Sequence, residues 1–240
     1  MRIELRDVCK RYGQISALRA VTLAVPSGQR VALVGPNGSG KSTLIRAIMG
    51  MLRVQGTIRL DGKELGSLDV ARKIAYVPQN TPLLNATVTD LIRFTELIRE
   101  LKVGSVEEVA RRLSLDTAAM ASQPIRSLSG GMRQKLMLAL AFVAPVSLLI
   151  LDEPTASLDE ETRHSFLDLY RQVPADTTIL VSTHQPEEVR LLAEYVVMLE
   201  DGEVISQGAT DELLTAEIVA ARADHWGNPG RRDWVPTWTR

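Results

Sequence analysis

The stretch GPNGSGKST, residues 35–43, constrains the fold of this chain more than any other feature of the sequence. It matches the pattern G-x-x-x-x-G-K-[ST] and lies between a short apolar run, RVALV, and a helical run over residues 41–52. Glycines at these positions let backbone N–H groups turn inward around phosphate oxygens, and the helix N-terminus adds positive potential. The sequence therefore predicts a phosphate loop, formed by Gly35, Pro36, Asn37, Gly38, Ser39, Gly40, Lys41, Ser42 and Thr43.

Two side chains of this loop have specific expected roles. Lys41 is expected to reach the β- and γ-phosphates of a nucleotide and to act in catalysis, and the Ser42 hydroxyl is expected to hold Mg²⁺. The alternative is a glycine-rich turn with an incidental lysine, which does not account for the strand before it and the helix after it. The pattern predicts a P-loop nucleotidase and does not distinguish a kinase, a GTPase or a motor.

An apolar run that ends in two acids, LLILDEP, supplies a second part of such a site. Asp152 stands where a P-loop protein holds Mg²⁺ through water, so we expect it to be a metal ligand. Glu153, one residue later, is placed to polarise the attacking water as a general base. The alternative is that two acids merely begin the loop before Pro154.

A histidine follows another apolar run, TTILVST, which we expect to be a strand. A lone histidine is usually a capping or surface residue. Ligands of layered α/β proteins, however, bind at the carboxyl ends of the strands. We therefore expect His184 to hydrogen-bond the γ-phosphate or the attacking water and to act in catalysis.

Residues 127–136, SLSGGMRQKL, place two adjacent glycines at the start of a helical run. Glycine in a helix costs roughly 1 kcal/mol relative to alanine, so the pair needs a reason. One explanation is a capped turn with Ser129 as the N-cap. The other is that a ligand approaches the backbone of Gly130 and Gly131 too closely for a Cβ.

Strand and helix patterns alternate at both ends of the chain, which predicts a layered α/β core. The N-terminal stretches IELRDV and VTLAV and the later TIRLDG and KIAYVP have strand character. Strand patterns vanish between about residues 87 and 144, so we expect a helical subdomain inserted over roughly residues 80–145. Towards the end, YVVMLEDGEVISQG predicts a hairpin that turns at Asp201-Gly202.

Composition excludes several functional classes. Lys and Arg number 28 against 29 Asp and Glu, so there is no basic excess of the kind that nucleic-acid binders carry. With Cys9 as the single cysteine no intrachain disulfide is possible, which fits a reducing compartment. No apolar run reaches the roughly 18 residues that span a bilayer, and the charged N-terminus does not have the pattern of a secretory signal. We expect a chain that is soluble or held at a membrane by a partner.

The order of these motifs resembles that of the ATP-binding subunits of ABC transporters. GPNGSGKST, the glutamine of YVPQN, LSGGM, LLILDEP, SLD and the final histidine follow one another with the family's spacing over about residues 1–215. The resemblance implies an α/β fold: a P-loop NTPase core with an antiparallel β subdomain and an inserted α-helical subdomain. Residues 216–240, which hold Trp226, Trp234 and Trp238, would form a separate C-terminal tail.

The resemblance also implies an answer to the question of the two glycines. In this family two subunits face each other head to tail with two ATP molecules between them. Each ATP lies on one subunit's phosphate loop and under the other's LSGG segment. Ser129, Gly130 and Gly131 would then contact the γ-phosphate of an ATP held by the partner, and the cofactors would be ATP and Mg²⁺.

Three further positions match the family's motif one at a time. Gln79 matches the glutamine that joins the core to the helical subdomain and senses Mg²⁺ and the γ-phosphate. Asp159 matches the aspartate that links the two sites across the dimer. Tyr12 matches an aromatic residue that stacks on adenine, with a surface tyrosine near a turn as the alternative.

One position departs from the family's commonest signature, in which a glutamine stands where this chain has Met132. Methionine cannot copy a glutamine hydrogen bond to the nucleotide sugar, although it leaves the Ser-Gly-Gly segment unchanged. The Gly-Met-Arg-Gln form is more similar to subunits of exporters than to those of many importers.

The function that the resemblance implies is hydrolysis of ATP to power a membrane transporter. The expected partners are a second copy or a homologous ATPase subunit and transmembrane permease subunits, with no nucleic acid. The chain would lie in the cytoplasm, on the membrane face, through the permease. The alternatives are a soluble ABC-type ATPase of DNA repair or translation, and a regulator that only binds nucleotide.

Overall fold

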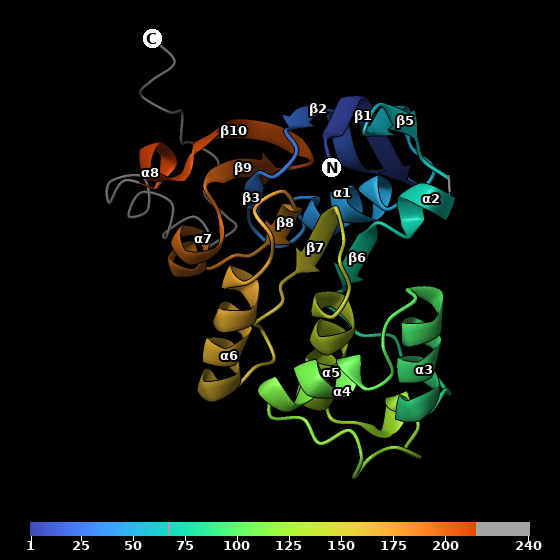
Figure 1. Ribbon diagram of the computed structural model, residues 1–240. Helices are drawn as coiled ribbons and strands as arrows, with labels where there is room; N and C mark the ends of the chain where they lie inside the picture. The colour runs from blue at the N-terminus through green and yellow to red at the C-terminus, as the bar shows by residue number, and fades with distance from the viewer. Residues whose placement is uncertain (67, 215–240) are drawn as a thin grey trace.

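A computed structural model describes residues 1–66 and 68–214, in which two β-sheets share one chain (Figure 1). The smaller sheet is antiparallel and has the strand order β2-β1-β4-β5. Its strands are β1 (Ile3–Tyr12), β2 (Ile15–Val25), β4 (Gln55–Leu60) and β5 (Lys63–Glu64). This is the antiparallel β region that was expected, and β5 is a short strand that the sequence pattern did not predict.

The larger sheet has six strands in the order β10-β9-β3-β8-β7-β6. Strands β3, β6, β7, β8 and β9 run parallel, and β10 pairs antiparallel with β9 through the predicted hairpin. Asp201 and Gly202 have φ angles of 47° and 83°, as a tight hairpin turn requires. The bounds are β3 (Arg30–Val34), β6 (Ile74–Val77), β7 (Leu148–Asp152), β8 (Thr178–Ser182), β9 (Tyr195–Glu200) and β10 (Glu203–Ala209).

Eight α-helices connect or cover these strands within the described residues: α1 (Lys41–Ile48), α2 (Leu68–Ala71), α3 (Val88–Ile98), α4 (Ser105–Arg112), α5 (Gly130–Phe142), α6 (Glu160–Arg171), α7 (Pro186–Leu192) and α8 (Thr210–Leu213). The predicted helix over residues 41–52 ends earlier than expected. Gly50 takes a left-handed φ of 70°, and the N–H of Met51 donates to the carbonyl of Arg46, which closes the helix. Helices α2 and α8 are single turns that the sequence pattern did not predict.

The helical stretch lacks strands, as predicted. Between residues 87 and 144 the described structure contains α3, α4, a 3₁₀ turn at Ile125–Ser127 and α5, with one isolated bridge between Thr87 and Pro124. Figure 1 shows these helices gathered at the opposite end of the molecule from the small sheet. No described helix combines the length and the apolar character that crossing a membrane requires. The predicted C-terminal tail and its three tryptophans lie outside the described residues.

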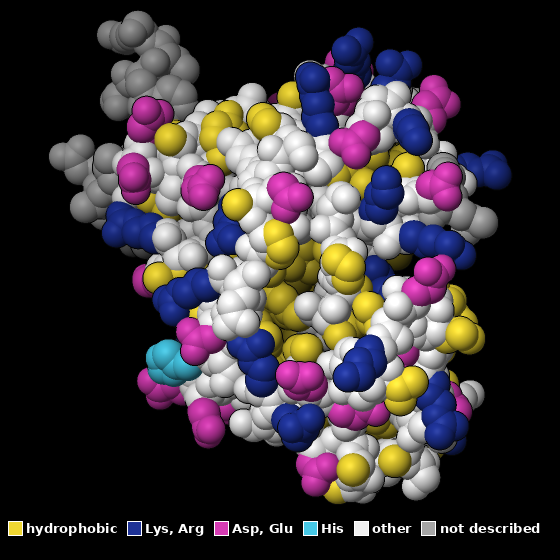
Figure 2. All heavy atoms as spheres, viewed as in Figure 1, with side chains coloured by type: hydrophobic (Ala, Val, Ile, Leu, Met, Phe, Trp, Pro, Cys, Tyr) yellow, Lys and Arg dark blue, Asp and Glu magenta, His cyan; other side chains and the backbone are white. Residues whose placement is uncertain are grey.

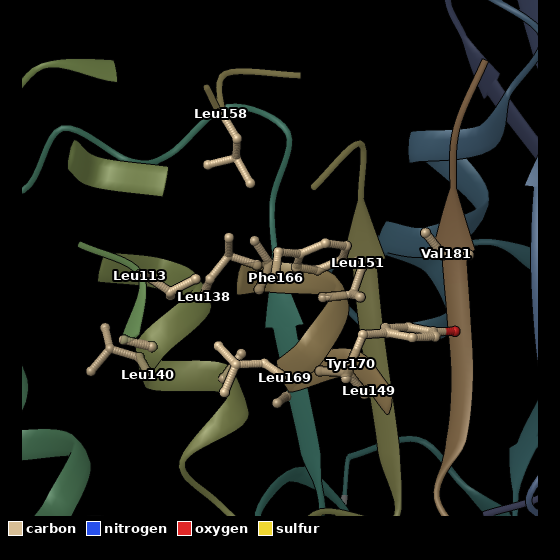
Figure 3. Close-up of a cluster of buried hydrophobic side chains, with 14 of the residues drawn as sticks. Leu113, Leu138, Leu140, Leu149, Leu151, Leu158, Phe166, Leu169, Tyr170 and Val181 are labelled. Carbon is tan, nitrogen blue, oxygen red and sulfur yellow. The ribbon is translucent and has the colours of Figure 1, made fainter. Parts of the chain in front are cut away.

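The parallel strands of the six-stranded sheet are buried on both faces, and alternate residues of one strand enter different cores. Leu149 and Leu151 of β7 join the core formed with α5 and α6, where Phe166 and Tyr170 pack against the sheet (Figure 3). Leu148 and Ile150 of the same strand join the core formed with α1 and the small sheet. This double burial explains why β7 and β8 are continuous apolar runs and not alternating ones. The carboxyl ends of β7 and β8 lie side by side at one edge of this buried sheet, and the polar residues of the candidate site begin there.

Candidate functional site

The phosphate loop joins β3 to α1 in a backbone path that needs glycine. Gly35 has a φ of 151°, and a Cβ there would lie 2.1 Å from the carbonyl oxygen of Leu199. Gly40 has a φ of 107° and is the N-cap of α1, with no side chain capping the helix. The free N–H groups of the first turn of α1 are therefore available to an anion.

The Lys41 side chain lies along this loop and is only 6% exposed. Its ammonium donates hydrogen bonds to the carbonyl oxygens of Gly35 (2.7 Å) and Pro36 (3.1 Å). Burial lowers the pKa of Lys41, and the nearby carboxylates of Glu153 and Asp152 oppose that shift. The lysine is thus a buried cation between the loop and two acids.

Asp152 ends β7 and is 1% exposed, so its carboxylate is held inside the sheet edge. The hydroxyl of Ser182, at the end of the neighbouring strand β8, donates to its Oδ1 over 2.5 Å. The available donors are hard oxygens, those of Asp152, the Ser42 hydroxyl and the Gln79 amide, which suit Mg²⁺. The described residues contain no group of three or more His, Cys, Asp or Glu side chains that could enclose a metal. A single carboxylate with two neutral oxygen ligands still fits Mg²⁺, because this ion commonly binds through one or two carboxylates together with substrate phosphates.

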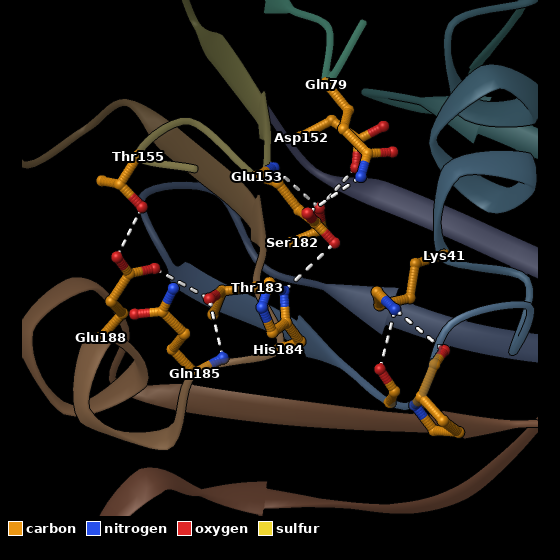
Figure 4. A network of polar contacts seen from close by, with 12 residues as sticks. Lys41, Gln79, Asp152, Glu153, Thr155, Ser182, Thr183, His184, Gln185 and Glu188 are labelled. Carbon is orange, nitrogen blue, oxygen red and sulfur yellow. Dashed lines mark hydrogen bonds and ion pairs between the residues drawn. The ribbon is translucent and has the colours of Figure 1, made fainter. Parts of the chain in front are cut away.

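Glu153 follows in a left-handed backbone conformation, with a φ of 49°, which is uncommon for a residue other than glycine. Its N–H donates to the carbonyl and to the hydroxyl oxygen of Ser182, both at 3.1 Å. Its carboxylate accepts a hydrogen bond from the Gln79 amide at 2.9 Å and lies 3.4 Å from Nδ1 of His184 (Figure 4). The acid is therefore turned towards two predicted site residues that come from other strand ends.

A cavity of about 580 Å³ gathers most of these groups, within the size range of small-molecule pockets. Its lining includes the loop from Asn37 to Thr43 except Ser39, together with Gln79 and Glu153. Gln14, in the turn after β1, and Ile15, the first residue of β2, also line it, but Tyr12 does not. Tyr12 is 45% exposed at the end of β1, with the Lys10 ammonium 5.1 Å from its ring centroid, so its stacking role stays a prediction.

A larger hollow of about 1050 Å³ lies elsewhere, over β1, β2 and the start of β4. It is lined by residues such as Cys9, Arg19 and Arg53 and contains no residue of the phosphate loop. Size alone would favour this hollow as the site. The smaller cavity is the better candidate because the phosphate loop, Gln79 and Glu153 all line it.

The Ser129 segment is built separately from that cavity. Ser129 caps α5, and its hydroxyl accepts a hydrogen bond from the N–H of Met132 at 3.2 Å, so the capped-turn interpretation is confirmed. A Cβ at Gly130 would have nothing of this chain within 4 Å, whereas one at Gly131 would lie 3.2 Å from the carbonyl oxygen of Ser157. No described part of the chain therefore requires glycine at position 130. Met132 is partly buried against the hydrophobic core, where a methionine packs well.

The first turns of α5 are tied to the segment that follows Glu153. The Gln134 amide donates to the carbonyl oxygen of Pro154 at 3.1 Å, and Lys135 pairs with Asp159 at 3.2 Å. Asp159 also caps α6, accepting a hydrogen bond from the N–H of Thr162 at 2.8 Å. The hydrogen bonds from Thr162 and the charge of Lys135 lower the pKa of Asp159 to about 2.

Sequence reasoning missed four polar residues that hold the site together. These are Ser182, which orients Asp152, and the linked group of Thr155, Thr183 and Glu188. A signal was present, since TTILVST ends in two hydroxyl residues immediately before the histidine. Its apolar pattern predicts a strand and does not report what those two hydroxyls bind.

Comparison with known proteins agrees with this geometry. The sequence profile of a family described as "ABC transporter" matches residues 18–156. The methionine import ATP-binding protein MetN of Brucella abortus (strain 2308) is 34% identical over 86% of this chain, and the match spans only 59% of that relative's length. The Nod factor export ATP-binding protein I of Ralstonia nicotianae is also 34% identical, over 90% of this chain and 70% of the relative.

Solved structures give the same result. The structure of an ATP-binding subunit of an ABC transporter superposes with a TM-score of 0.77 at 30% identity, over 89% of this chain and 92% of the other. A dimeric bacterial ABC transporter cassette superposes with a TM-score of 0.76 at 26% identity, over 87% and 98% of the two chains.

Proposed function

The chain belongs to the ABC transporter family, and from that premise we propose that it binds and hydrolyses ATP to power a membrane transporter. One observation carries the proposal. The Glu153 carboxylate, held in a strained backbone position, is in contact with both Gln79 and His184 at the mouth of the phosphate-loop cavity. A fixed carboxylate beside a phosphate site is what activation of a water requires.

Each group has a distinct task in this scheme. Lys41 and the N–H groups at the start of α1 bind the β- and γ-phosphates, and Tyr12 stacks on the adenine. Ser42, Asp152 and Gln79 hold Mg²⁺, which when bound would neutralise charge on the phosphates. Glu153 takes the proton of the attacking water, and His184 hydrogen-bonds the γ-phosphate or that water.

A second copy of this chain, or a homologous subunit, would complete the site. The Ser129 segment offers a serine hydroxyl and bare N–H groups at a helix N-terminus, which suits an anion. One chain has one phosphate loop, and no described atom of the chain explains the glycine at 130. In a head-to-tail dimer Ser129, Gly130 and Gly131 serve the partner's ATP, and Asp159 links the two sites.

The test is a mixed dimer of two inactive variants, Lys41→Ala and Ser129→Arg. If Ser129 acts across the dimer, one composite site collects both changes and the other keeps Lys41 and Ser129 intact. That mixed dimer should hold one occluded ATP, whereas each variant alone should hold none. Occluded ATP per cross-linked mixed dimer is the quantity to measure. A value near zero from two folded variants would reject the shared site, and a wild-type chain without MgATP hydrolysis would reject the function.

Transmembrane permease subunits are the proposed partners, and they would keep the chain on the cytoplasmic face of a membrane. Helix α3 exposes Phe94 (60%), Leu97 (78%) and Ile98 (42%), which suits packing against a helix of a permease. Figure 2 shows basic and acidic side chains interspersed over the viewed face, which suits a protein partner more than a nucleic acid. Copurification with ribosomes or DNA and without a membrane protein would favour the DNA repair or translation alternative.

The division of the chain is also a proposal. Residues 1–215 form the ATP-binding domain, with the helical subdomain over about residues 80–145, and residues 216–240 form a tail. The relatives named above include both an importer and an exporter at equal identity, so we propose no direction of transport.

A further inference from the structure

Glu188 is a buried carboxylate that the scheme above does not use. It lies in the first turn of α7 and is 7% exposed. Its Oε1 accepts a hydrogen bond from the Thr155 hydroxyl at 2.5 Å, and its Oε2 accepts one from the Thr183 hydroxyl at 2.8 Å (Figure 4). No Lys or Arg pairs with it among residues 1–66 and 68–214. A buried charge without a cation is costly, so the two hydroxyl bonds need an explanation.

The Thr183 bond fixes the backbone on both sides of His184. The Thr183 hydroxyl, while donating to Glu188, accepts a hydrogen bond from the N–H of Gln185 at 3.1 Å. The N–H of Thr183 itself donates to the carbonyl oxygen of Leu33, on the strand that leads into the phosphate loop. The residues on both sides of His184, Thr183 and Gln185, are therefore held by backbone hydrogen bonds. Glu188 orients the Thr183 hydroxyl that accepts one of these bonds.

The Thr155 bond reaches the segment that carries the acid. Thr155 is two residues after Glu153, in the turn in which the N–H of Ala156 approaches the carbonyl oxygen of Glu153 at 3.4 Å. Glu153 and His184 come from the ends of two different strands, and their side chains meet at 3.4 Å. Through its bonds to Thr155 and Thr183, the carboxylate of Glu188 bridges the segments that follow these two strands.

We propose that Glu188 is a positioning residue that sets the geometry of Glu153 against His184 by holding Thr155 and Thr183 at once. The inference rests on the proposed function, because it assigns a task within ATP hydrolysis. Misplacement of a reacting group by about 1 Å can cost on the order of 10²-fold in rate. Loss of this bridge should therefore lower kcat, while the affinity of the phosphate loop for ATP should stay unchanged.

The decisive comparison is between two neighbouring glutamates of α7. Glu188→Ala should lower kcat by about 10- to 100-fold with the ATP dissociation constant within about twofold of wild type. Glu188→Gln, which keeps one acceptor oxygen, should fall between. Glu187 is exposed on the same helix turn, and Glu187→Ala is the matched control that should retain wild-type kcat. A kcat for Glu188→Ala within twofold of wild type would reject the proposal.

Single hydroxyl deletions cover the case in which Glu188→Ala does not fold. Thr155→Val and Thr183→Val each remove one bond and keep the side-chain shape, whereas Thr155→Ser keeps the bond. We expect both valine variants to lose kcat and the serine variant to keep it. When Thr183→Val is added to His184→Ala, kcat should fall by less than about twofold relative to His184→Ala alone, because Thr183 acts through that histidine. A full multiplicative loss of kcat there would mean that Thr183 acts independently of His184, which would contradict the proposed positioning role.

Amide hydrogen exchange separates this inference from the proposed function. The Gln185 N–H, bonded to Thr183, should exchange faster in Glu188→Gln than in Glu187→Gln, whether or not the protein hydrolyses ATP. Unchanged exchange at Gln185, alongside a wild-type chain that hydrolyses ATP, overturns the positioning role alone. Absence of hydrolysis by the wild type, with the exchange effect present, overturns the proposed function and leaves the bridge intact.

Discussion

The phosphate loop and the Ser129 segment are both glycine-containing turns that lead into a helix, but this chain holds them in different ways. In the phosphate loop, glycine is required by the chain itself, since a Cβ at Gly35 would overlap the backbone of β9. In the Ser129 segment, the Cβ position of Gly130 faces nothing of the described chain. The helix after the loop has no side-chain cap, whereas Ser129 caps the helix after its own segment.

The difference shows which part of a binding site one chain can complete alone. Lys41 is hydrogen-bonded to the carbonyl oxygens of the phosphate loop and Glu153 lines the same cavity, so the geometry of the loop is set when this chain folds. In the proposed dimer, the Ser129 segment is a helix N-terminus whose ligand comes from the partner chain. The described residues give no packing reason for glycine at position 130, and the proposed dimer supplies one.

The largest expected effect, on the rate of ATP hydrolysis, comes from removing the general base Glu153 while leaving the phosphate loop and the Ser129 segment unchanged. Glu153→Gln should bind MgATP and hydrolyse it about 10²–10⁴-fold more slowly, because a carboxamide cannot accept the proton. The ATP-bound form should then accumulate as a closed dimer, detected by size-exclusion chromatography with ATP. Glu160→Gln, an exposed glutamate at the start of α6, is the control that should hydrolyse normally. Near-normal turnover of Glu153→Gln would remove Glu153 from the catalytic role.

A pair of alanine substitutions tests the comparison of the two glycines directly. Gly35→Ala should destabilise the free chain by about 3 kcal/mol, through a left-handed φ and a backbone overlap, and lower Tm by about 6–12 °C. Gly130→Ala should leave Tm unchanged or slightly raised, since alanine favours the helix. It should nevertheless lower ATP hydrolysis about tenfold or more, because the new methyl group crowds the partner's ATP. Normal hydrolysis by Gly130→Ala would contradict the partner's close approach.

The strand, loop and helix around residues 35–43 could be predicted from the sequence because their requirements are local. A strand, a glycine pattern, a lysine and a helix are contiguous, and burial on both faces makes β3, β7 and β8 readable as apolar runs. Asp152 is predicted from the general arrangement of P-loop sites, and His184 from the rule that ligands bind at the carboxyl ends of strands. The fold class was recognised from the order of the motifs.

The contacts between strand ends could not be predicted in the same way. The bonds from Ser182 to Asp152 and from Thr155 to Glu188 join residues about 30 positions apart, and their register depends on which strands are neighbours. The same limit applies to α1, whose end depends on a left-handed Gly50 that periodicity does not reveal. The short elements β5, α2 and α8 are too brief for a hydrophobic period to be counted.

Substitution of Tyr12 should have a smaller effect, on ATP affinity, and it tests whether the phosphate-loop region also binds the adenine. If it stacks on adenine, Tyr12→Ala should weaken ATP binding by about 1–3 kcal/mol, and Tyr12→Trp should bind normally. Binding measured by calorimetry with ATP and with inorganic triphosphate separates the base from the phosphates, because triphosphate affinity should not change. Equal ATP affinity of the alanine variant would favour the surface-tyrosine alternative, which its 45% exposure leaves open.

The smallest effect concerns a contact that ties the helix after Ser129 to the segment after Glu153. Lys135, on the helix that Ser129 begins, pairs with Asp159, in the segment that follows Glu153. The pKa of Asp159 is lowered to about 2, against about 3.9 in an unfolded chain, so its ionised form stabilises the fold. That stabilisation is complete above about pH 4 and is lost as the pH falls through about 2. Asp159→Asn keeps an N-cap for α6 and removes the charge, so its Tm should lie slightly below wild type at pH 7 and converge with it as the pH approaches 2. A Tm difference that stays constant from pH 7 to pH 2 would mean that the charge of Asp159 contributes nothing and that α5 is joined to the segment after Glu153 by Gln134 and packing alone.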